Sequence, residues 1–240
     1  MGFGNWDFAK LIRNYELLYC FMSKIKILTS QVGYNMAAAN YDKKEKYLNS
    51  FEKNQIWPLL GGLSGKKVLD VGAGTGRLAV AMSKMGAEVF ALDISEKMLA
   101  ELESKSKKIY PVKSSLSEGG EAAFNGVETI IADAECLPFT QDTFDWVVAA
   151  FLIVHLKDPS LFFDQAYRVL KDGGRLLVTN INQKEPPEIR TSSGTIKIES
   201  FYHRPEKIRE ILQSLAFTIE KEIIVKEGEN WINQIIVARK

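Results

Sequence analysis

The sequence of 240 residues has few of the side chains that hold metals or form redox pairs. It contains two cysteines, Cys20 and Cys136, and two histidines, His155 and His203. The cysteines lie far apart and have neither the spacing of a zinc site nor that of a redox pair. We expect both to be small, buried or half-buried apolar residues. We also expect no bound metal, because no cluster of His, Cys and carboxylate residues stands out.

A strong net charge is also lacking. The 31 Lys and Arg residues nearly balance the 30 Asp and Glu residues, which leaves a formal net charge of +1. This balance gives no electrostatic reason to expect a nucleic acid or an anionic membrane surface as a partner. We therefore predict that the protein binds neither.

Long uninterrupted apolar runs are missing as well. The stretch 11–28 is apolar, but charged residues such as Arg13 and Lys24 interrupt it, which argues against a membrane span. Residues 1–10 show neither the basic region nor the apolar region of a signal peptide. These features predict a cytoplasmic protein.

The overall composition indicates a globular α/β protein. Hydrophobic residues make up 46% of the sequence and charged residues 25%, as in soluble domains, and the length suffices for one large core. Apolar residues spaced three and four apart predict an amphipathic helix over 8–25, and a second helical stretch is expected over 36–55. We expect residues 1–60 to form an N-terminal helical cap that packs on the rest of the chain. A lid over the substrate or a homodimer contact is the alternative role of the first helix.

A strand, a glycine turn and a helix follow one another over residues 66–80, and the rest of the chain is organised around them. The run VLDV, which contains Asp70, is otherwise apolar, as in a buried parallel strand. Gly72, Gly74 and Gly76 follow it at alternate positions. Glycine lets the backbone turn sharply and lets a ligand approach it closely, so we expect a ligand at this loop.

The acid before the glycines helps to identify that ligand. A dinucleotide-binding loop has the pattern GxGxxG, but Arg77 stands where its third glycine would fall, and a P-loop would have a lysine after Gly76. Asp70 would repel a phosphate group but suits a ligand with an ammonium or a sulfonium group. Residues 68–76, VLDVGAGTG, resemble the glycine loop of class I S-adenosylmethionine-dependent methyltransferases. The run LKDGGRLLV, which begins at Leu170, resembles a segment of the same family.

The resemblance extends over residues 66–240 and implies the fold. It implies an α/β, Rossmann-like three-layer sandwich with a seven-stranded, mostly parallel sheet and an antiparallel last strand, preceded by the N-terminal helices. Residues 61–240 would then form the S-adenosylmethionine-binding methyltransferase domain. The seven strands are expected at residues 68–71, 88–93, 128–133, 144–150, 175–180, 218–226 and 231–238.

Several residues are expected to hold the cofactor. Asp93 ends the second expected strand, about 20 residues past the glycine loop, where an acid binds ribose hydroxyl groups; a helix cap or a loop anchor is its alternative role. The resemblance implies that Asp133 and Ala134 mark the adenine end, with a loop anchor as the alternative for Asp133. It also makes Tyr34 and Tyr41 candidates for contact with the methionine end. The expected set of cofactor-binding residues is Asp70, Gly72, Ala73, Gly74, Asp93, Ile94, Met98, Asp133, Ala134, Ala150 and Tyr41.

The two histidines are the candidate catalytic residues, because His titrates near neutral pH and can act as a general base. His155 follows the fourth expected strand, at the edge where open α/β sheets bind ligands, and many small-molecule members of the family have a His there. His203 lies in the long segment 182–204, which we expect to help close the acceptor site. A hydrogen-bonded structural role is the alternative for each histidine.

The motifs that are absent narrow the acceptor. The sequence has neither the [DN]PP[YF] motif that the family uses for nucleobase amines and glutamine nor a Pro-Cys nucleophile. It is most similar to the group that contains the ubiquinone and menaquinone biosynthesis methyltransferases. The resemblance implies methyl transfer from S-adenosylmethionine to a small-molecule acceptor by direct displacement. A protein that binds S-adenosylmethionine without turnover is the alternative, and a NAD-dependent oxidoreductase is disfavoured by Asp70 and by the missing third glycine.

Overall fold

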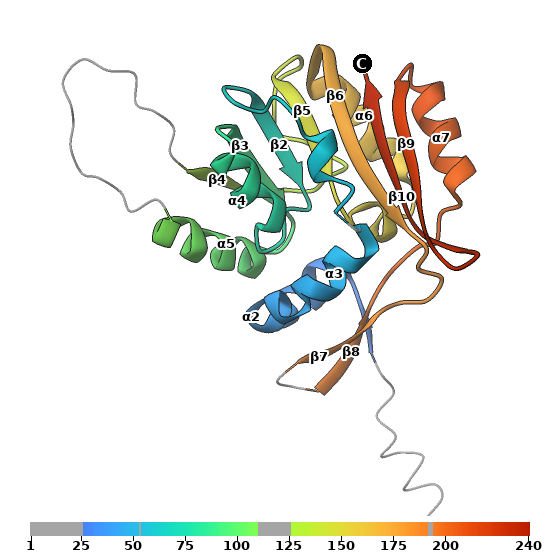
Figure 1. The fold of residues 1–240 in the computed structure, drawn as a ribbon. Helices are drawn as coiled ribbons and strands as arrows, with labels where there is room; N and C mark the ends of the chain where they lie inside the picture. Colours follow the sequence, from blue (N-terminus) through green and yellow to red (C-terminus); the bar gives the residue numbers. More distant parts are fainter. Residues whose placement is uncertain (1–25, 53, 110–125, 192–193) are drawn as a thin grey trace, which may run out of the picture.

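A seven-stranded sheet forms the centre of the computed structural model, which describes residues 26–52, 54–109, 126–191 and 194–240 (Figure 1). Its strands are β2 (Lys67–Val71), β3 (Glu88–Asp93), β4 (Val127–Ile131), β5 (Phe144–Ala149), β6 (Leu170–Ile181), β9 (Thr218–Glu227) and β10 (Asn230–Arg239). They lie in the order β4-β3-β2-β5-β6-β10-β9. Neighbours are parallel except where β10 pairs with β6 and with β9. The predicted mostly parallel sheet with an antiparallel last strand is therefore confirmed.

Helices cover both faces of this sheet. They are α4 (Arg77–Lys84) and α5 (Glu96–Ile109) on one face, and α6 (Pro159–Val169) and α7 (Pro205–Ser214) on the other. In β2, Leu69 and Val71 join the core under α6 and α7, whereas Val68 joins the core under α4 and α5, because successive side chains of a strand point to opposite faces. All three are fully buried, as in central parallel strands. The predicted Rossmann-like three-layer sandwich is confirmed.

Local sequence signals determine where α6 begins but not where it ends. Asp158 is the N-cap, and its side chain accepts a hydrogen bond from the backbone N–H of Ser160 at 3.1 Å, while Pro159 takes the first helical position. The glycine-rich run 171–174 predicts the end of the helix and a strand from residue 175. Instead, β6 begins directly after α6, because Leu170 already pairs with β5. Pairing with a neighbouring strand therefore decided this boundary.

Gly76 allows α4 and α5 to pack closely beside the glycine loop. Its φ is +86°, and a Cβ atom built on it would overlap Cδ1 of Leu102. We expect Gly76→Ala to lower the free energy of unfolding by about 2–4 kcal/mol, through backbone strain and overpacking together. Chemical denaturation measures this loss. Gly62→Ala is the matched control, because Gly62 has φ +70° but open space around its Cβ position; an equal loss in both variants would show that the contact with Leu102 does not matter.

The N-terminal part of the described chain is helical but differs from the prediction. It contains α2 (Ser30–Tyr41), the 3₁₀ turn η1 (Asp42–Lys44), α3 (Glu45–Glu52) and the 3₁₀ turn η2 (Trp57–Leu59). The predicted helix over 36–55 therefore begins earlier and is interrupted, while the predicted helix over 8–25 lies outside the described residues. Helix α2 shows no strong apolar periodicity in its first turns. Its packing stabilises it instead, since Gly33 lets it approach Ile198 so closely that a Cβ would lie 2.6 Å from Cγ1.

A second, smaller sheet lies against α2 (Figure 1). It consists of β1 (Ile27–Leu28), β7 (Glu188–Thr191) and β8 (Gly194–Ile198), in the order β1-β8-β7. Two of its strands come from the connector 182–204, which the sequence predicted as a long loop. Ile189, Ile196 and Ile198 bury their side chains with Ala37 of α2. The N-terminal segment and this connector thus share one small core. The expected boundary at residue 60, between the N-terminal helical cap and the domain 61–240, stays a prediction.

Surface features bear on two further expectations. Cys136 is exposed, so the expectation that it is at least half-buried is wrong: it lies in a turn closed by its N–H bond to the carbonyl of Asp133, and the next residue, Leu137, takes the buried position. Cys20 lies outside the described residues.

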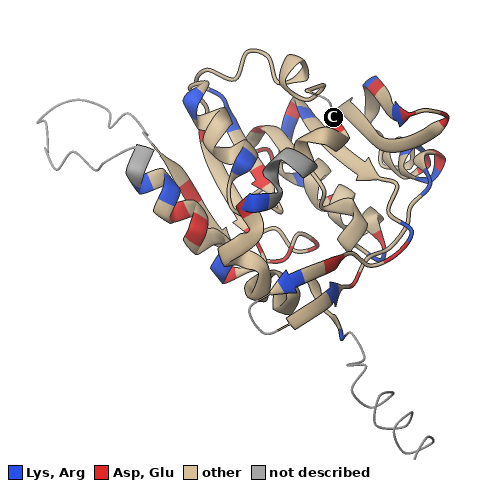
Figure 2. Ribbon diagram, turned by 60° about the horizontal axis from the view of Figure 1, so that its bottom comes forward, with Lys and Arg blue, Asp and Glu red and all other residues tan. Residues whose placement is uncertain are grey.

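Figure 2 shows basic and acidic residues interspersed along α5. Among the described helices, none is long and apolar enough to cross a membrane.

Candidate active site

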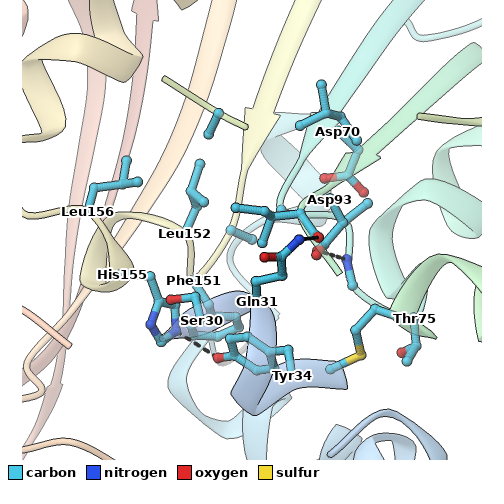
Figure 3. A pocket seen from close by; sticks show the side chains of 18 of the residues that line it. Ser30, Gln31, Tyr34, Asp70, Thr75, Asp93, Phe151, Leu152, His155 and Leu156 are labelled. Carbon is cyan, nitrogen blue, oxygen red and sulfur yellow. Dashed lines mark hydrogen bonds between the residues drawn. The ribbon is translucent and has the colours of Figure 1, made fainter. Parts of the chain in front are cut away.

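A cavity of about 570 Å³ opens where β2, β3 and β5 end at their carboxyl termini (Figure 3). This is the edge at which open α/β sheets bind ligands, and the volume lies within the range of small-molecule sites. Residues of α2 and Phe201, beyond β8, line it from the other side. The cavity therefore lies between the main sheet and the N-terminal segment.

All eleven residues predicted to bind the cofactor line this one cavity. They are Asp70, Gly72, Ala73, Gly74, Asp93, Ile94, Met98, Asp133, Ala134, Ala150 and Tyr41. They come from five separate parts of the chain, which the fold brings together. Their binding roles stay predictions, but their common location is what those roles require.

The glycine loop leaves open space for a ligand. Its turn is held to β3, because the backbone N–H groups of Gly72 and Ala73 both donate to the carbonyl of Leu92, at 2.8 and 3.0 Å. Gly74 has φ +56°, and a Cβ built on it would meet no atom within 4 Å. The backbone is thus bare on the cavity side at Gly74, where a ligand can approach it without a side chain in the way.

Asp70 is a buried carboxylate with unused hydrogen-bonding capacity. Its exposed fraction is only 2%, and its Oδ2 atom has no hydrogen-bond partner. Burial raises the pKa of Asp70 to about 7, although the Arg77 guanidinium and the N–H of Ala79 act in the opposite direction. An ammonium group in the cavity would give Oδ2 a partner and favour the charged carboxylate. The site therefore fits a ligand with an ammonium group, as S-adenosylmethionine has.

Asp93 and Asp133 both anchor their own loops. The Oδ2 atom of Asp93 accepts from the N–H of Gly74 at 2.8 Å, and its Oδ1 accepts from the N–H of Ser95 at 2.8 Å. Burial raises the pKa of Asp93, while these backbone bonds oppose the rise. Asp133 Oδ1 accepts from the N–H of Glu135 at 2.9 Å. The anchoring role named as the alternative is therefore present for both. A carboxylate oxygen has a second lone pair, so ligand hydroxyl or amine groups can still bind.

Helix α2 is held beside the cavity by polar residues that the sequence did not single out. Gln31 Nε2 donates to the carbonyl of Ile94 at 3.3 Å, and Asn35 Oδ1 accepts from Ser95 Oγ at 2.7 Å and from the N–H of Lys97 at 3.2 Å. These bonds join α2 to the start of α5. No local motif marks them, because each partner lies about sixty positions away in the chain.

Three more residues tie η1 to the glycine loop. Thr75 Oγ1 donates to Asp42 Oδ1 at 2.6 Å, and Lys105 of α5 lies 2.6 Å from Asp42 Oδ2. Lys105 also donates to the backbone carbonyl of Thr75 at 2.8 Å. All three line the cavity, and they too were missed from the sequence. The N-terminal segment is thus hydrogen-bonded directly to the loop expected to hold the cofactor.

The structure separates the two candidate histidines. His155 lines the cavity, and its Nε2 lies 2.7 Å from the hydroxyl of Tyr34 (Figure 3). Its Nδ1 lies 3.0 Å from the backbone carbonyl of Glu199. His203 does not line the cavity; its Nε2 bonds to the backbone carbonyl of Leu156 at 2.8 Å, which is the structural role named as its alternative. Only His155 is therefore placed to take part in chemistry in this cavity.

Comparisons with known proteins agree with this geometry. A family model described as a methyltransferase domain matches residues 69–178. The ubiquinone/menaquinone biosynthesis C-methyltransferase UbiE of Klebsiella pneumoniae subsp. pneumoniae is 32% identical over an alignment of 206 residues, and the match covers 82% of this chain and 70% of that protein. The demethylmenaquinone methyltransferase of Clavibacter sepedonicus is 30% identical over an alignment of 162 residues, and the match covers 65% of this chain. This chain spans 60% of the length of the Clavibacter protein.

A solved structure supports the fold. The crystal structure of magnesium protoporphyrin IX methyltransferase (ChlM) from Synechocystis PCC 6803 with bound SAM superposes with a TM-score of 0.59 at 22% identity. The match covers 83% of this chain and 82% of that one. Together with the family model and the Klebsiella relative, the glycine loop and the seven-stranded sheet lead to one conclusion. The chain belongs to the class I S-adenosylmethionine-dependent methyltransferase family.

Proposed function

We propose that this chain transfers a methyl group from S-adenosylmethionine to a small-molecule acceptor by direct displacement. One observation carries the proposal. A single cavity contains the bare glycine loop with its two buried carboxylates, Asp70 and Asp93, together with a hydrogen-bonded Tyr34–His155 pair. The glycine loop and its carboxylates suit the cofactor, and the Tyr34–His155 pair is proposed to take a proton from the acceptor.

Each part of the cavity has a proposed task. Asp70 pairs with the ammonium group of the methionine moiety, Asp93 accepts from the ribose hydroxyls, and Asp133 with Ala134 binds the adenine edge. When bound, the cofactor supplies a methyl group that is already activated by its sulfonium. The chain mainly has to hold the acceptor in line with that group and exclude water, and such positioning supplies roughly 7–11 kcal/mol of a barrier.

The acceptor is proposed to be a small molecule of apolar character. The volume of about 570 Å³ has to contain the cofactor and the reacting part of the acceptor together. Demethylmenaquinone, for which the Clavibacter relative is named, is the first compound to test in reduced form. We further propose a cytoplasmic location. A homodimer contact through residues 8–25 stays a prediction, since these residues lie outside the described part.

Binding of the cofactor is tested first, by thermal shift with S-adenosylmethionine, S-adenosylhomocysteine and NAD. A ligand at about 100 times its dissociation constant adds ~2.7 kcal/mol, or roughly 5–10 °C in a chain of this size. Both adenosyl compounds should give this shift and NAD should give none. Asp93→Ala should abolish the shift, because it removes the ribose acceptor and the anchor of Gly74. Asp164→Ala, an exposed position on α6, is the control that should keep it.

The outcomes separate the candidate functions. A shift with NAD alone would contradict the proposed function and the proposed cofactor site. A shift with the adenosyl compounds, together with methylated product from an acceptor, supports the methyltransferase. Cofactor binding with no product from any acceptor would favour the alternative, a protein that binds S-adenosylmethionine without turnover.

A further inference from the structure

Three groups from distant parts of the chain form one hydrogen-bonded series beside the cavity. Figure 3 shows two of them, Tyr34 and His155, on the side of the cavity away from Asp70. The three groups are the hydroxyl of Tyr34 in α2, the ring of His155 in the 3₁₀ turn η3 (Ile153–His155), and the backbone carbonyl of Glu199 after β8. The two rings meet edge to face, with centroids 5.2 Å apart and planes at 89°. Each ring nitrogen of His155 thus has one hydrogen-bond partner, and together the two partners fix the orientation of the ring.

The carbonyl determines which nitrogen of His155 carries the proton. A carbonyl oxygen only accepts hydrogen bonds, so Nδ1 must donate to Glu199. In the neutral ring Nε2 is then the acceptor, and the hydroxyl of Tyr34 donates to it at 2.7 Å. The Tyr34 hydroxyl is also hydrogen-bonded to that of Tyr41, which must then donate to the Tyr34 oxygen, so one lone pair of this oxygen remains available to a donor in the cavity. The series therefore has one direction, in which a proton can pass from Tyr34 to His155.

Tyr34 and His155 also line a second, smaller cavity of about 100 Å³. Apart from these two residues, Tyr41 and Gln183, its walls are apolar, and three of them are aromatic or proline rings. The apolar wall residues are Leu48, Phe51, Phe151, Val154, Ile181, Pro187 and Ile189. An apolar group in this smaller cavity would lie beside Tyr34, which also lines the main cavity.

We propose that Tyr34 is a catalytic residue that takes the proton of an O–H or N–H group on a flat, apolar acceptor. His155 is the positioning residue that receives the hydroxyl proton of Tyr34 in turn. This inference rests on the proposed methyl transfer. To that proposal the inference adds the residue that touches the acceptor. It also adds the class of acceptor, a molecule with an aromatic or enolic hydroxyl or amine group whose ring occupies the smaller cavity.

The step balances in atoms and charge. The acceptor oxygen or nitrogen forms a bond to the methyl carbon while the bond from that carbon to sulfur breaks, and sulfur keeps the electron pair. The acceptor proton passes to the oxygen of Tyr34 as the hydroxyl proton of Tyr34 passes to Nε2 of His155. Tyr34 ends unchanged and His155 ends as an imidazolium held by Glu199. One positive charge is lost at sulfur and one appears on the imidazole ring.

The protonation states before reaction agree with these roles. Burial lowers the pKa of His155 below its usual 6.5, with the Glu199 carbonyl opposing, so the ring is neutral at pH 7 and can accept a proton. Burial raises the pKa of Tyr34 well above 10, so its hydroxyl keeps the proton that it donates. Transfer should thus be independent of pH near neutrality and fall only in acid. The other titratable groups that face the pair are Tyr41, Asp93, Lys157 and Glu199.

The test compares Tyr34→Phe with wild type on two probe acceptors, 2-naphthol and 4-nitrothiophenol. The first is un-ionised at neutral pH and needs a base, whereas the second is already ionised. We expect the rate of 2-naphthol methylation to fall about a hundredfold and that of the thiolate to change less than about threefold. The dissociation constant for S-adenosylhomocysteine should stay the same. Tyr202→Phe, which lies outside both cavities, should leave both rates unchanged.

A second variant and a measurement on the free protein complete the test. His155→Gln should lose a similar factor on 2-naphthol, and the double variant should lose no more than either single variant, because the two residues act as a unit. Nitrogen NMR of the free protein should show the Nδ1–H tautomer of His155. Equal rates on 2-naphthol in wild type and Tyr34→Phe, or the Nε2–H tautomer, would overturn the role of Tyr34. Wild type that binds S-adenosylhomocysteine but methylates neither probe would overturn the acceptor class, whereas absent binding would contradict the proposed function.

Discussion

Asp70→Asn is expected to weaken the binding of S-adenosylhomocysteine by about two to four orders of magnitude. In the proposed complex the Asp70 carboxylate pairs with the ligand's ammonium group inside a buried site. Removing one partner of a buried ion pair costs about 3–5 kcal/mol, because it leaves the other charge without compensation. The asparagine keeps an oxygen for the N–H of Ala79, so the strand and turn should persist. Calorimetric titration of both proteins measures the loss.

The same carboxylate makes cofactor binding depend on pH. The pKa of Asp70 is about 7 in the free protein, and a bound ammonium group would lower it. Binding therefore has to release the proton of Asp70 whenever the pH lies below about 7. Affinity for S-adenosylhomocysteine should fall by up to about tenfold for each pH unit below 7, and stay level above it. The Asn variant should bind weakly at every pH.

The stability of the free protein should change in the opposite direction. The pKa of Asp70 is raised from 3.8, so between pH 4 and 7 the folded state binds more protons than the unfolded state. The free energy of unfolding therefore loses a contribution from Asp70 as the pH rises through this window, and Asp70→Asn should be more stable than wild type near pH 7. Asp164→Asn, an exposed control, should change neither property. An Asn variant that binds normally would refute the proposed ion pair.

Glu52→Ala is expected to lower the free energy of unfolding by about 3–5 kcal/mol. The Glu52 carboxylate forms a double hydrogen bond with the guanidinium of Arg77, at 2.6 and 2.7 Å, and Asn49 accepts from Arg77 at 3.0 Å. The side chains are only 3% and 14% exposed. Truncating Glu52 would leave the Arg77 charge buried with a single neutral acceptor, which is the costly way to break such a pair. This pair also joins α3 to the first turn of α4.

Denaturant unfolding measures this prediction, with Glu206→Ala as its control. Glu206 lies 3.5 Å from Arg209 on α7 and is 63% exposed, so its loss should cost no more than about 0.5 kcal/mol. Glu52→Gln should fall between the two, because it keeps hydrogen-bond acceptance and loses the charge. A loss below about 1 kcal/mol for Glu52→Ala would mean that Arg77 finds another partner or reaches water.

The part of the cavity that is proposed to hold the cofactor could be located from the sequence because its signals are local. Asp70 and the glycines belong to one strand-turn-helix unit. Asp93 ends β3, and Asp133 follows the end of β4, its parallel neighbour. Parallel strands bring their carboxyl ends to one edge of a sheet, so a sequence that predicts the strands also predicts which strand ends lie together. All eleven predicted residues accordingly line one cavity. Within the main sheet, the errors concerned boundaries such as the start of β6.

The part that is proposed to face the acceptor could not be located in the same way. Tyr34 and His155 lie 121 positions apart and meet only because α2 packs across the edge of the sheet. The sequence marked both histidines as equal candidates, and only the fold turned His203 toward the carbonyl of Leu156 instead of the cavity. The small sheet of β1, β7 and β8 was missed, because it is made of short strands from distant segments and has little core of its own.

The sequence by itself determined the class of fold, the ligand loop and the family, since each depends on short-range patterns of apolar residues, glycines and acids. The tertiary structure alone decided which histidine lines the cavity and how the N-terminal segment is held. Examples are the bond from Thr75 to Asp42 and the buried pair of Arg77 and Glu52. Such contacts depend on the packing of whole elements against one another, so their partners can lie at almost any separation in the chain.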